Sequence, residues 1–256
     1  MRETPTGALA FDANAENYER TIARTLEPVA RRVVERAALQ PGETVLDVGT
    51  GTGTAAAFAM GEGRTVFGID GSPAMIELAR RSVPGATFDA MDFARLTFAD
   101  GTFDVVVASH SLLFADDRLA ALGEWLRVTR PGGRLSLSVP GPETVTPTAV
   151  FGEVYERHGI RNLRRYPTVE SLADEVEGAG WTDVQADADS TVAIRLPDEG
   201  LFRAWRSIGT LGMATRDWRP EQQEALTVDM LQVAPRDAEG AYVLPFGAHY
   251  LSAVAG

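Results

Sequence analysis

The sequence predicts an α/β fold in which a doubly wound, mainly parallel sheet is covered by helices on both faces. Between residues 44 and 140, short apolar runs alternate with helical segments, and a glycine-rich turn follows the first run. Parallel strands joined by helical crossovers are buried on both faces, so they read as continuous apolar runs. The 256 residues, 45% of them hydrophobic, are sufficient for one sizeable core.

Each element of this fold has its own signal in the sequence. Apolar residues at spacings of three and four over 17–38 predict an amphipathic helix that ends at Gln40, Pro41 and Gly42. The expected strands are 44–49, 64–70, 86–92, 103–109 and 134–140. The expected helices between them are 54–60, 73–82 and 116–128.

The pattern changes beyond Pro140. We expect helices at 147–159 and 171–180, strand-like alternation over 181–196, helices at 201–214 and 220–234, and a final strand at 241–255. Because two helices precede the last strand, we expect one domain, 1–256, with 142–180 and 198–236 as cap insertions over the sheet. Residues 1–40 would form an amino-terminal helical lid, and 41–141 the ligand-binding core.

Composition excludes several classes of partner. The net charge of -12 repels phosphate backbones, so we expect neither nucleic acid nor an anionic membrane surface as a partner. The absence of cysteine excludes disulfides, thiolate metal sites and cysteine nucleophiles. The amino terminus lacks the apolar core of a signal peptide, and no run of about 18 apolar residues occurs. We therefore expect a cytoplasmic protein.

The turn after the first strand, VLDVGTGTG, has the form of a nucleotide-binding loop. Its glycines Gly49, Gly51 and Gly53 allow a sharp turn and a close approach of backbone to ligand. A dinucleotide loop, GxGxxG, would need its third glycine where Thr54 stands. A carboxylate at Asp47 would also repel a pyrophosphate, and it would favour a ligand with a positive charge.

Two further acids end the second and third strands. Asp70 is placed to accept the hydroxyls of a ribose, which fits NAD and any adenosine ligand alike. Asp92 could accept from an adenine amino group while Phe93 borders the ring. Alternatively, Asp92 is a solvated loop acid or a helix N-cap. A separate alternative is that the glycine turn is only a tight strand-to-helix turn that binds no ligand. Adenine, ribose and a cationic end together indicate S-adenosyl-L-methionine.

Four segments then carry a resemblance to a known family: VLDVGTGTG (45–53), GIDGSPAMIELAR (68–80), MDFARLTFADGTFDVVVASHSLLF (91–114) and LRVTRPGGRLSLSVPG (126–141). The sequence resembles the class I S-adenosylmethionine-dependent methyltransferases, in the branch similar to ubiquinone and menaquinone methyltransferases. The resemblance implies a Rossmann-like, doubly wound sheet of seven strands in the order 3-2-1-4-5-7-6. Its antiparallel seventh strand would lie within 241–253.

The resemblance also implies residue roles. Asp47 and the backbone of Gly49 and Gly51 would hold the methionine end, Asp70 the ribose, and Tyr18 would fold over the methionine part. Met75, Asp92 and Phe93 would surround the adenine. The full set of expected cofactor-binding residues is Tyr18, Asp47, Gly49, Thr50, Gly51, Gly53, Asp70, Gly71, Met75, Asp92, Phe93 and Ser109.

Methyl transfer from a sulfonium needs alignment and exclusion of water, and it needs a general base only when the nucleophile must lose a proton. Of the three histidines, His110 follows the fourth strand and is the first candidate for a catalytic base or substrate contact. Equally, its ring could be structural. His158 could be a favourable helix C-terminal residue, and His249, among alternating apolar residues, is expected to pack.

We expect no metal site. The pair Asp116 and Asp117 could suggest magnesium, but no supporting acid and amide pair follows, so we expect it to cap the next helix. The fourth strand ends in Ala108, Ser109 and His110. The Asn-Pro-Pro-Tyr type sequence of enzymes that methylate amino groups of bases is missing there.

The cap supplies the remaining clue to the acceptor. About a third of its large apolar residues are expected to line an acceptor pocket: Phe151, Tyr155, Tyr166, Phe202, Trp205, Ile208, Leu211, Met213, Trp218 and Met230. Arg161, Arg164 and Arg165 form either a solvated loop face or a site for an acceptor carboxylate or phosphate.

The expected function is methyl transfer to an oxygen or carbon of a small, largely apolar metabolite, by a monomer or homodimer. The alternatives are an S-adenosylmethionine-binding protein with a structural, regulatory or non-methylating role, and an NAD oxidoreductase.

Overall fold

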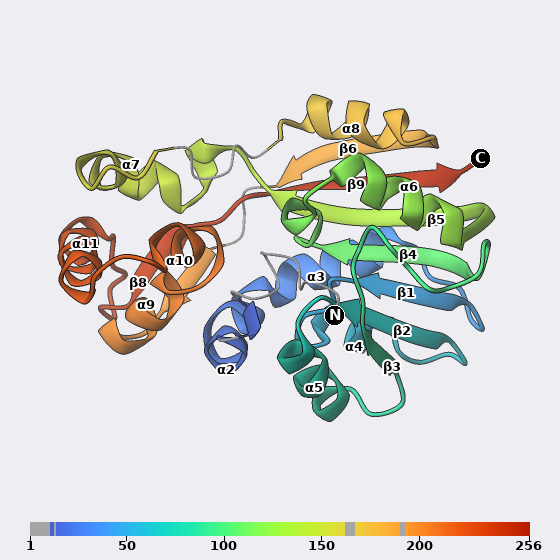
Figure 1. Ribbon diagram of the computed structural model, residues 1–256, viewed down its shortest axis with the longest axis horizontal. Helices are drawn as coiled ribbons and strands as arrows, with labels where there is room; N and C mark the ends of the chain where they lie inside the picture. Colours follow the sequence, from blue (N-terminus) through green and yellow to red (C-terminus); the bar gives the residue numbers. More distant parts are fainter. Residues whose placement is uncertain (1–10, 13, 162–166, 190–192) are drawn as a thin grey trace.

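The computed structural model describes residues 11–12, 14–161, 167–189 and 193–256. A seven-stranded sheet in the order β3-β2-β1-β4-β5-β9-β6 forms its centre (Figure 1). The strands are β1 Thr44–Val48, β2 Thr65–Asp70, β3 Thr87–Ala90, β4 Phe103–Ser109, β5 Thr129–Pro140, β6 Trp181–Asp189 and β9 Ala248–Ala255. The first five are parallel, and β9 runs antiparallel to β5 and β6. This confirms the predicted order with its antiparallel seventh strand.

Helices cover both faces of the sheet, because alternate strand residues point to opposite sides. On one face, Val45 and Val105 pack with α3 Arg24–Arg36, α4 Thr54–Ala59 and α5 Pro73–Ser82. On the other face, Leu46 and Val106 pack with α6 Arg118–Val128 and α8 Val169–Gly178. Asp47, between Val45 and Val48, thus belongs to a strand buried on both sides.

The amino-terminal helix has three parts, α2 Ala15–Tyr18, a π-helical turn η1 Glu19–Ala23, and α3. Its existence over 17–38 is confirmed, but the π turn was not predicted. Such turns occur often at functional sites, and Tyr18 and Ile22 of this segment lie on the cavity wall described below.

The cap has an apolar cluster of its own. The elements of the cap that contribute to this cluster are α7 Pro147–Arg157, β7 Ala193–Leu196, α9 Glu199–Arg206, α10 Gly209–Thr215, α11 Pro220–Val233 and β8 Tyr242–Pro245. Strands β7 and β8 pair antiparallel as a separate two-stranded sheet. In Figure 1 these elements lie to one side of the carboxyl edge of the main sheet. Two short 3-10 turns, η2 Leu112–Phe114 and η3 Glu143–Val145, complete the described elements.

Three predicted elements in this region are wrong in extent. The final strand over 241–255 is divided into β8, which pairs with β7, and β9, which pairs with β5 and β6. Between them the Gly247 N–H donates to the Val145 carbonyl at 2.6 Å. The run 181–196 likewise divides between the two sheets. The helix over 201–214 breaks where Ile208 is extended and Gly209 has a φ of +64°.

Candidate functional site

A cavity of about 470 Å³ lies between the carboxyl edge of the sheet and the cap. Its size is within the range of small-molecule sites. The loops after β1, β2, β3 and β4 all contribute to its wall. Of the predicted cofactor-binding and catalytic residues, ten line this cavity: Tyr18, Gly49, Gly51, Asp70, Gly71, Met75, Asp92, Phe93, Ser109 and His110.

Three predicted residues, Asp47, Thr50 and Gly53, are buried and are not on the cavity wall. Asp47 Oδ2 accepts from Thr50 Oγ1 at 2.7 Å and from the Ala56 backbone N–H at 3.0 Å. Burial raises the pKa of Asp47 to about 7, despite those two hydrogen bonds. The Asp47 side chain therefore joins the turn to the first residues of α4.

Asp70 connects the ends of β1 and β2. Its carboxylate accepts from the Gly51 N–H at 3.0 Å and the Ser72 N–H at 2.9 Å. Burial raises the pKa of Asp70 to about 6. A carboxylate has further lone pairs, so this side chain can accept from a ligand as well.

The amino-terminal segment closes the cavity with aromatic side chains. The Tyr18 ring would lie 3.7 Å from a Cβ at Gly51, so it covers the glycine turn. Phe11 packs edge-on against Tyr18, with centroids 5.7 Å apart, and against Phe114 at 4.9 Å. Asp12 fixes this segment to α5 by accepting from Ser72 Oγ at 2.8 Å.

Carboxylates near the Tyr18 hydroxyl disfavour negative charge at that position. Burial raises the pKa of Tyr18, and the carboxylates of Asp70, Glu19 and Asp47 raise it further. A field that disfavours a phenolate also disfavours a pyrophosphate, and it stabilises a cation.

The loop between β3 and β4 carries Asp92 and Phe93. Asp92 is an exposed loop acid whose Oδ1 accepts from the Ala94 N–H at 3.0 Å, and no helix follows it, so the N-cap alternative is wrong. The other carboxylate oxygen is available to a ligand on the cavity wall.

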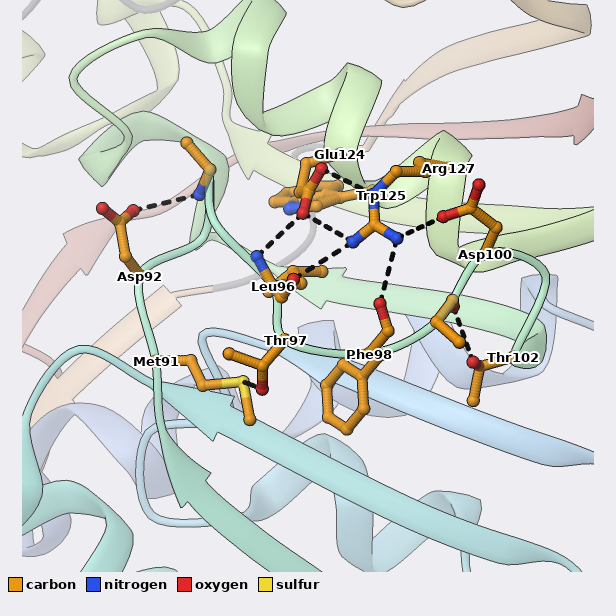
Figure 2. Close-up of polar contacts among 12 residues, drawn as sticks. Met91, Asp92, Leu96, Thr97, Phe98, Asp100, Thr102, Glu124, Trp125 and Arg127 are labelled. Atoms are coloured by element: carbon orange, nitrogen blue, oxygen red, sulfur yellow. Dashed lines mark hydrogen bonds and ion pairs between the residues drawn. The ribbon is translucent and has the colours of Figure 1, made fainter.

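Helix α6 holds this loop in place, as Figure 2 shows. Arg127 donates to the Phe98 carbonyl at 2.9 Å and to the Leu96 carbonyl at 3.1 Å. Glu124 accepts from the Leu96 N–H at 2.9 Å, and Trp125 Nε1 donates to the Phe93 carbonyl at 3.1 Å. Since three side chains of one helix bind its backbone, the loop that carries Asp92 and Phe93 has a defined position.

His110 sits at the end of β4 in a left-handed backbone conformation, with φ +60°. Its Nδ1 lies 2.9 Å from Ser138 Oγ, and its ring packs against Phe246 with centroids 5.3 Å apart. Nε2 is buried and has no hydrogen-bond partner among the described residues. Burial lowers the pKa of His110 to about 4, so the imidazole is neutral at physiological pH.

The other histidines lie away from this wall. His158 Nε2 lies 3.0 Å from Asp229 Oδ2 within the cap, and His249 is buried in β9. Asp117 accepts from the Ala120 N–H at 3.0 Å as the N-cap of α6, which confirms its predicted role. Within the described ranges no cluster of three metal-ligating side chains occurs, and no helix is long and apolar enough to cross a bilayer.

Four of the predicted cap residues line the cavity: Tyr155, Trp205, Ile208 and Leu211. Phe151, Phe202 and Met230 are instead buried in the cap cluster, while Met213 and Trp218 are not on the cavity wall. Arg164, Arg165 and Tyr166 lie outside the described residues, and Arg161 is exposed.

The sequence analysis missed other wall residues, among them Phe11, Ser111, Arg206 and Phe246. Only Arg206 had a readable signal. It lies four residues along from Phe202 and next to Trp205, and these three are the buried residues of the LFRAWR helix, where a charge is unexpected.

The wall fits an adenosine ligand with a cationic end. Asp70 and Asp92 supply acceptors at two neighbouring strand ends, Gly51 leaves the backbone open toward Tyr18, and the local carboxylates favour positive charge.

Comparison with known proteins identifies the family. Residues 46–137 match the family model described as a methyltransferase domain. The demethylmenaquinone methyltransferase of Mycolicibacterium vanbaalenii is 34% identical over 205 residues, which cover 70% of this chain and 87% of that protein. The nocamycin O-methyltransferase of Saccharothrix syringae is 26% identical over 258 residues, covering 91% and 92%.

A solved S-adenosylmethionine-dependent methyltransferase of Thermotoga maritima has the same fold. Its TM-score is 0.61 at 18% identity, and the match covers 97% of this chain and 99% of that one. The chain therefore belongs to the class I S-adenosylmethionine-dependent methyltransferases, in the branch similar to ubiquinone and menaquinone methyltransferases, and its cofactor is S-adenosyl-L-methionine.

Proposed function

We propose that this enzyme transfers a methyl group to an oxygen or carbon atom of a small, largely apolar organic acceptor. The observation that carries the proposal is one continuous cavity, which runs from the glycine turn past His110 to the aromatic and aliphatic residues of the cap. The names of the related proteins, a demethylmenaquinone and a nocamycin methyltransferase, support a small-molecule acceptor.

At the sheet end of the cavity, the proposed cofactor residues divide by position. Asp70 holds the ribose, and Asp92, Phe93 and Met75 surround the adenine. Tyr18 covers the methionine end above Gly49 and Gly51, with Gly71 and Ser109 on the adjoining wall. Asp47, Thr50 and Gly53 act through the loop that they hold. When bound, S-adenosylmethionine supplies a methyl group on a sulfonium, which is already an activated leaving group.

His110 is the proposed base. His110 lies on the cavity wall with a neutral ring; its Nδ1 is 2.9 Å from Ser138 Oγ, and its Nε2 is buried with no hydrogen-bond partner among the described residues. If Nδ1 carries the hydrogen and donates it to Ser138 Oγ, Nε2 is an acceptor for the proton of a phenol or an acidic carbon. The left-handed backbone of His110 and the Phe246 contact hold the ring in that orientation.

The amino-terminal lid and the cap exclude water in this proposal. Phe11, Tyr18 and Phe114 form the aromatic closure on one side. Tyr155 and Trp205 of the cap enclose the acceptor on the other. Exclusion of water protects the transfer and aligns the acceptor with the methyl group.

The test is incubation with methyl-labelled S-adenosylmethionine and a panel of phenols, naphthols and quinols, followed by detection of label in the acceptor. Label transfer is expected for the wild type, and a large loss of rate for the His110→Asn variant, which keeps the backbone conformation. Tight cofactor binding with no label transfer across the panel would favour a role without methylation.

A further inference from the structure

Arg206, at the last residue of α9, is a buried cation on the wall of the acceptor half of the cavity. Only 7% of the residue is exposed. It shares this wall with Tyr155, Trp205, Ile208 and Leu211, so its surroundings are mainly apolar.

The guanidinium has almost no polar partner in the described part of the chain. Its Nη1 donates to Thr215 Oγ1 across 3.5 Å, which is a long contact. Arg206 Nε is buried without a partner. Arg203, on the same helix, is by contrast ion-paired with Glu199 and Glu224.

An unpaired buried charge is costly, because burial removes its hydration and nothing replaces it. Desolvation, and then the neighbouring Arg203, lower the pKa of Arg206. A guanidinium nevertheless stays protonated in proteins. In the described part of the chain, Glu224 favours the charged form of Arg206 only from a distance, and Nε is buried without a hydrogen-bond partner, so an anionic ligand in the cavity would neutralise the charge directly.

We propose that the methyl acceptor carries a carboxylate, and that Arg206 binds it and so determines specificity. This rests on the proposed function of the cavity. One buried cation in an apolar wall matches one monoanion, and a guanidinium fork fits a carboxylate with two parallel hydrogen bonds. The acceptor lies with its anionic end at Arg206 and its reacting atom toward His110.

The experiment measures binding of two isosteric probes by isothermal titration calorimetry to protein saturated with S-adenosylhomocysteine. 1-Naphthoate carries the carboxylate, and 1-naphthamide is its neutral counterpart. Wild type is expected to bind the naphthoate at least about tenfold more tightly. The preference should disappear in Arg206→Met and be partly retained in Arg206→Lys, which keeps the charge without the fork.

Arg206→Met is expected to fold, since an apolar chain of similar length replaces an unpaired buried charge. Its thermal midpoint without ligand should be equal to or above that of wild type, whereas a merely structural arginine would lower it on removal. The matched control is Arg216→Met, which removes an exposed cap arginine paired with Asp217 and should leave the preference unchanged.

Equal affinity of wild type for the two probes, absence of naphthoate binding, or an unchanged preference in Arg206→Met would overturn the proposal. If the naphthoate preference depends on Arg206 while no acceptor is methylated, the carboxylate site stands and the proposed function fails. The two failures are thus distinguishable.

Discussion

Replacing Gly49 by alanine should destabilise the protein more than the same change at other glycines with positive φ. A Cβ at Gly49 would lie 2.2 Å from Ser111 Cβ and 2.9 Å from Ser111 Oγ, and Gly49 has a φ of +68°. Ser111 cannot move away freely, because its hydroxyl donates to the Val48 carbonyl at 2.6 Å.

The expected cost has two parts. The left-handed backbone contributes about 1–2 kcal/mol for a residue with a Cβ, and the overlap with Ser111 adds about 1–3 kcal/mol. Gly63 has a φ of +72° with nothing near a new Cβ, so Gly63→Ala should cost the first part alone. Gly51→Ala should cost the same in stability, since the Tyr18 ring is 3.7 Å away, but its methyl group would narrow the cavity.

The assay is guanidinium unfolding followed by the fluorescence of the buried Trp125 and Trp181, with affinity for S-adenosylhomocysteine measured in parallel. Gly49→Ala in a Ser111→Gly background completes a double-mutant cycle that isolates the contact. Equal free energies of unfolding for Gly49→Ala and Gly63→Ala would refute the reasoning. If Gly51→Ala binds S-adenosylhomocysteine as tightly as wild type does, the proposed position of the methionine end beside Gly51 is wrong.

Four further predictions concern other parts of the site. His110→Asn should lower turnover about 10²–10⁴-fold with little change in S-adenosylhomocysteine affinity. The pKa of His110 is about 4 in the folded protein and 6.5 in the unfolded chain, so protonation favours the unfolded chain as the pH falls. Urea unfolding should show that the free energy of unfolding of wild type falls by about 3 kcal/mol more than that of this variant between pH 7 and pH 4. Affinity for S-adenosylhomocysteine should fall as pH drops through about 6, where Asp70 protonates, and calorimetry of Asp70→Asn should show a flatter profile. A pH-independent affinity in wild type would contradict that role. Arg127→Met should weaken cofactor binding by releasing the Asp92 loop. Arg118→Met, on the same helix α6, removes an ion pair with Glu175 of α8 and should leave cofactor binding unchanged.

Strand and helix positions near the glycine turn followed from local pattern. The helix predicted at 73–82 and the strand at 103–109 agree with α5 and β4 in both bounds. Each is short, apolar in the expected period, and bounded by turn or cap residues such as Ser72, so local signals and tertiary packing agree. The strand-end acids also reach one edge, because parallel strands present their carboxyl ends together.

The remainder depended on contacts that local pattern does not contain. At the break between β8 and β9, the Gly247 N–H donates to the carbonyl of Val145, a residue about a hundred positions away. The partner of Asp47 proved to be Thr50 and the start of α4, a matter of side-chain direction that strand position alone leaves open. Ser111 packs so closely against Gly49 that a Cβ at residue 49 would overlap it. Nothing in the sequence around either residue indicates this contact.

The cap was the least predictable part for the same reason. Its aromatic residues fill both a cluster of their own and the cavity wall, and sequence periodicity cannot tell which residues do which. Phe202 and Trp205, three residues apart on α9, have different roles, since only Trp205 lies on the wall. Arg206 was visible as an odd charge on an apolar helix face, but its importance depends on the absence of a described ion-pair partner.

The most direct test of the proposed function uses S-adenosylmethionine labelled with ¹³C in its methyl group and an acceptor found in the panel. Carbon NMR of the product identifies the atom that receives the methyl group. The account predicts a new methyl signal on oxygen or carbon, with S-adenosylhomocysteine formed in equal amount. A methyl signal on nitrogen, or bound cofactor that persists unreacted beside every acceptor, would contradict it.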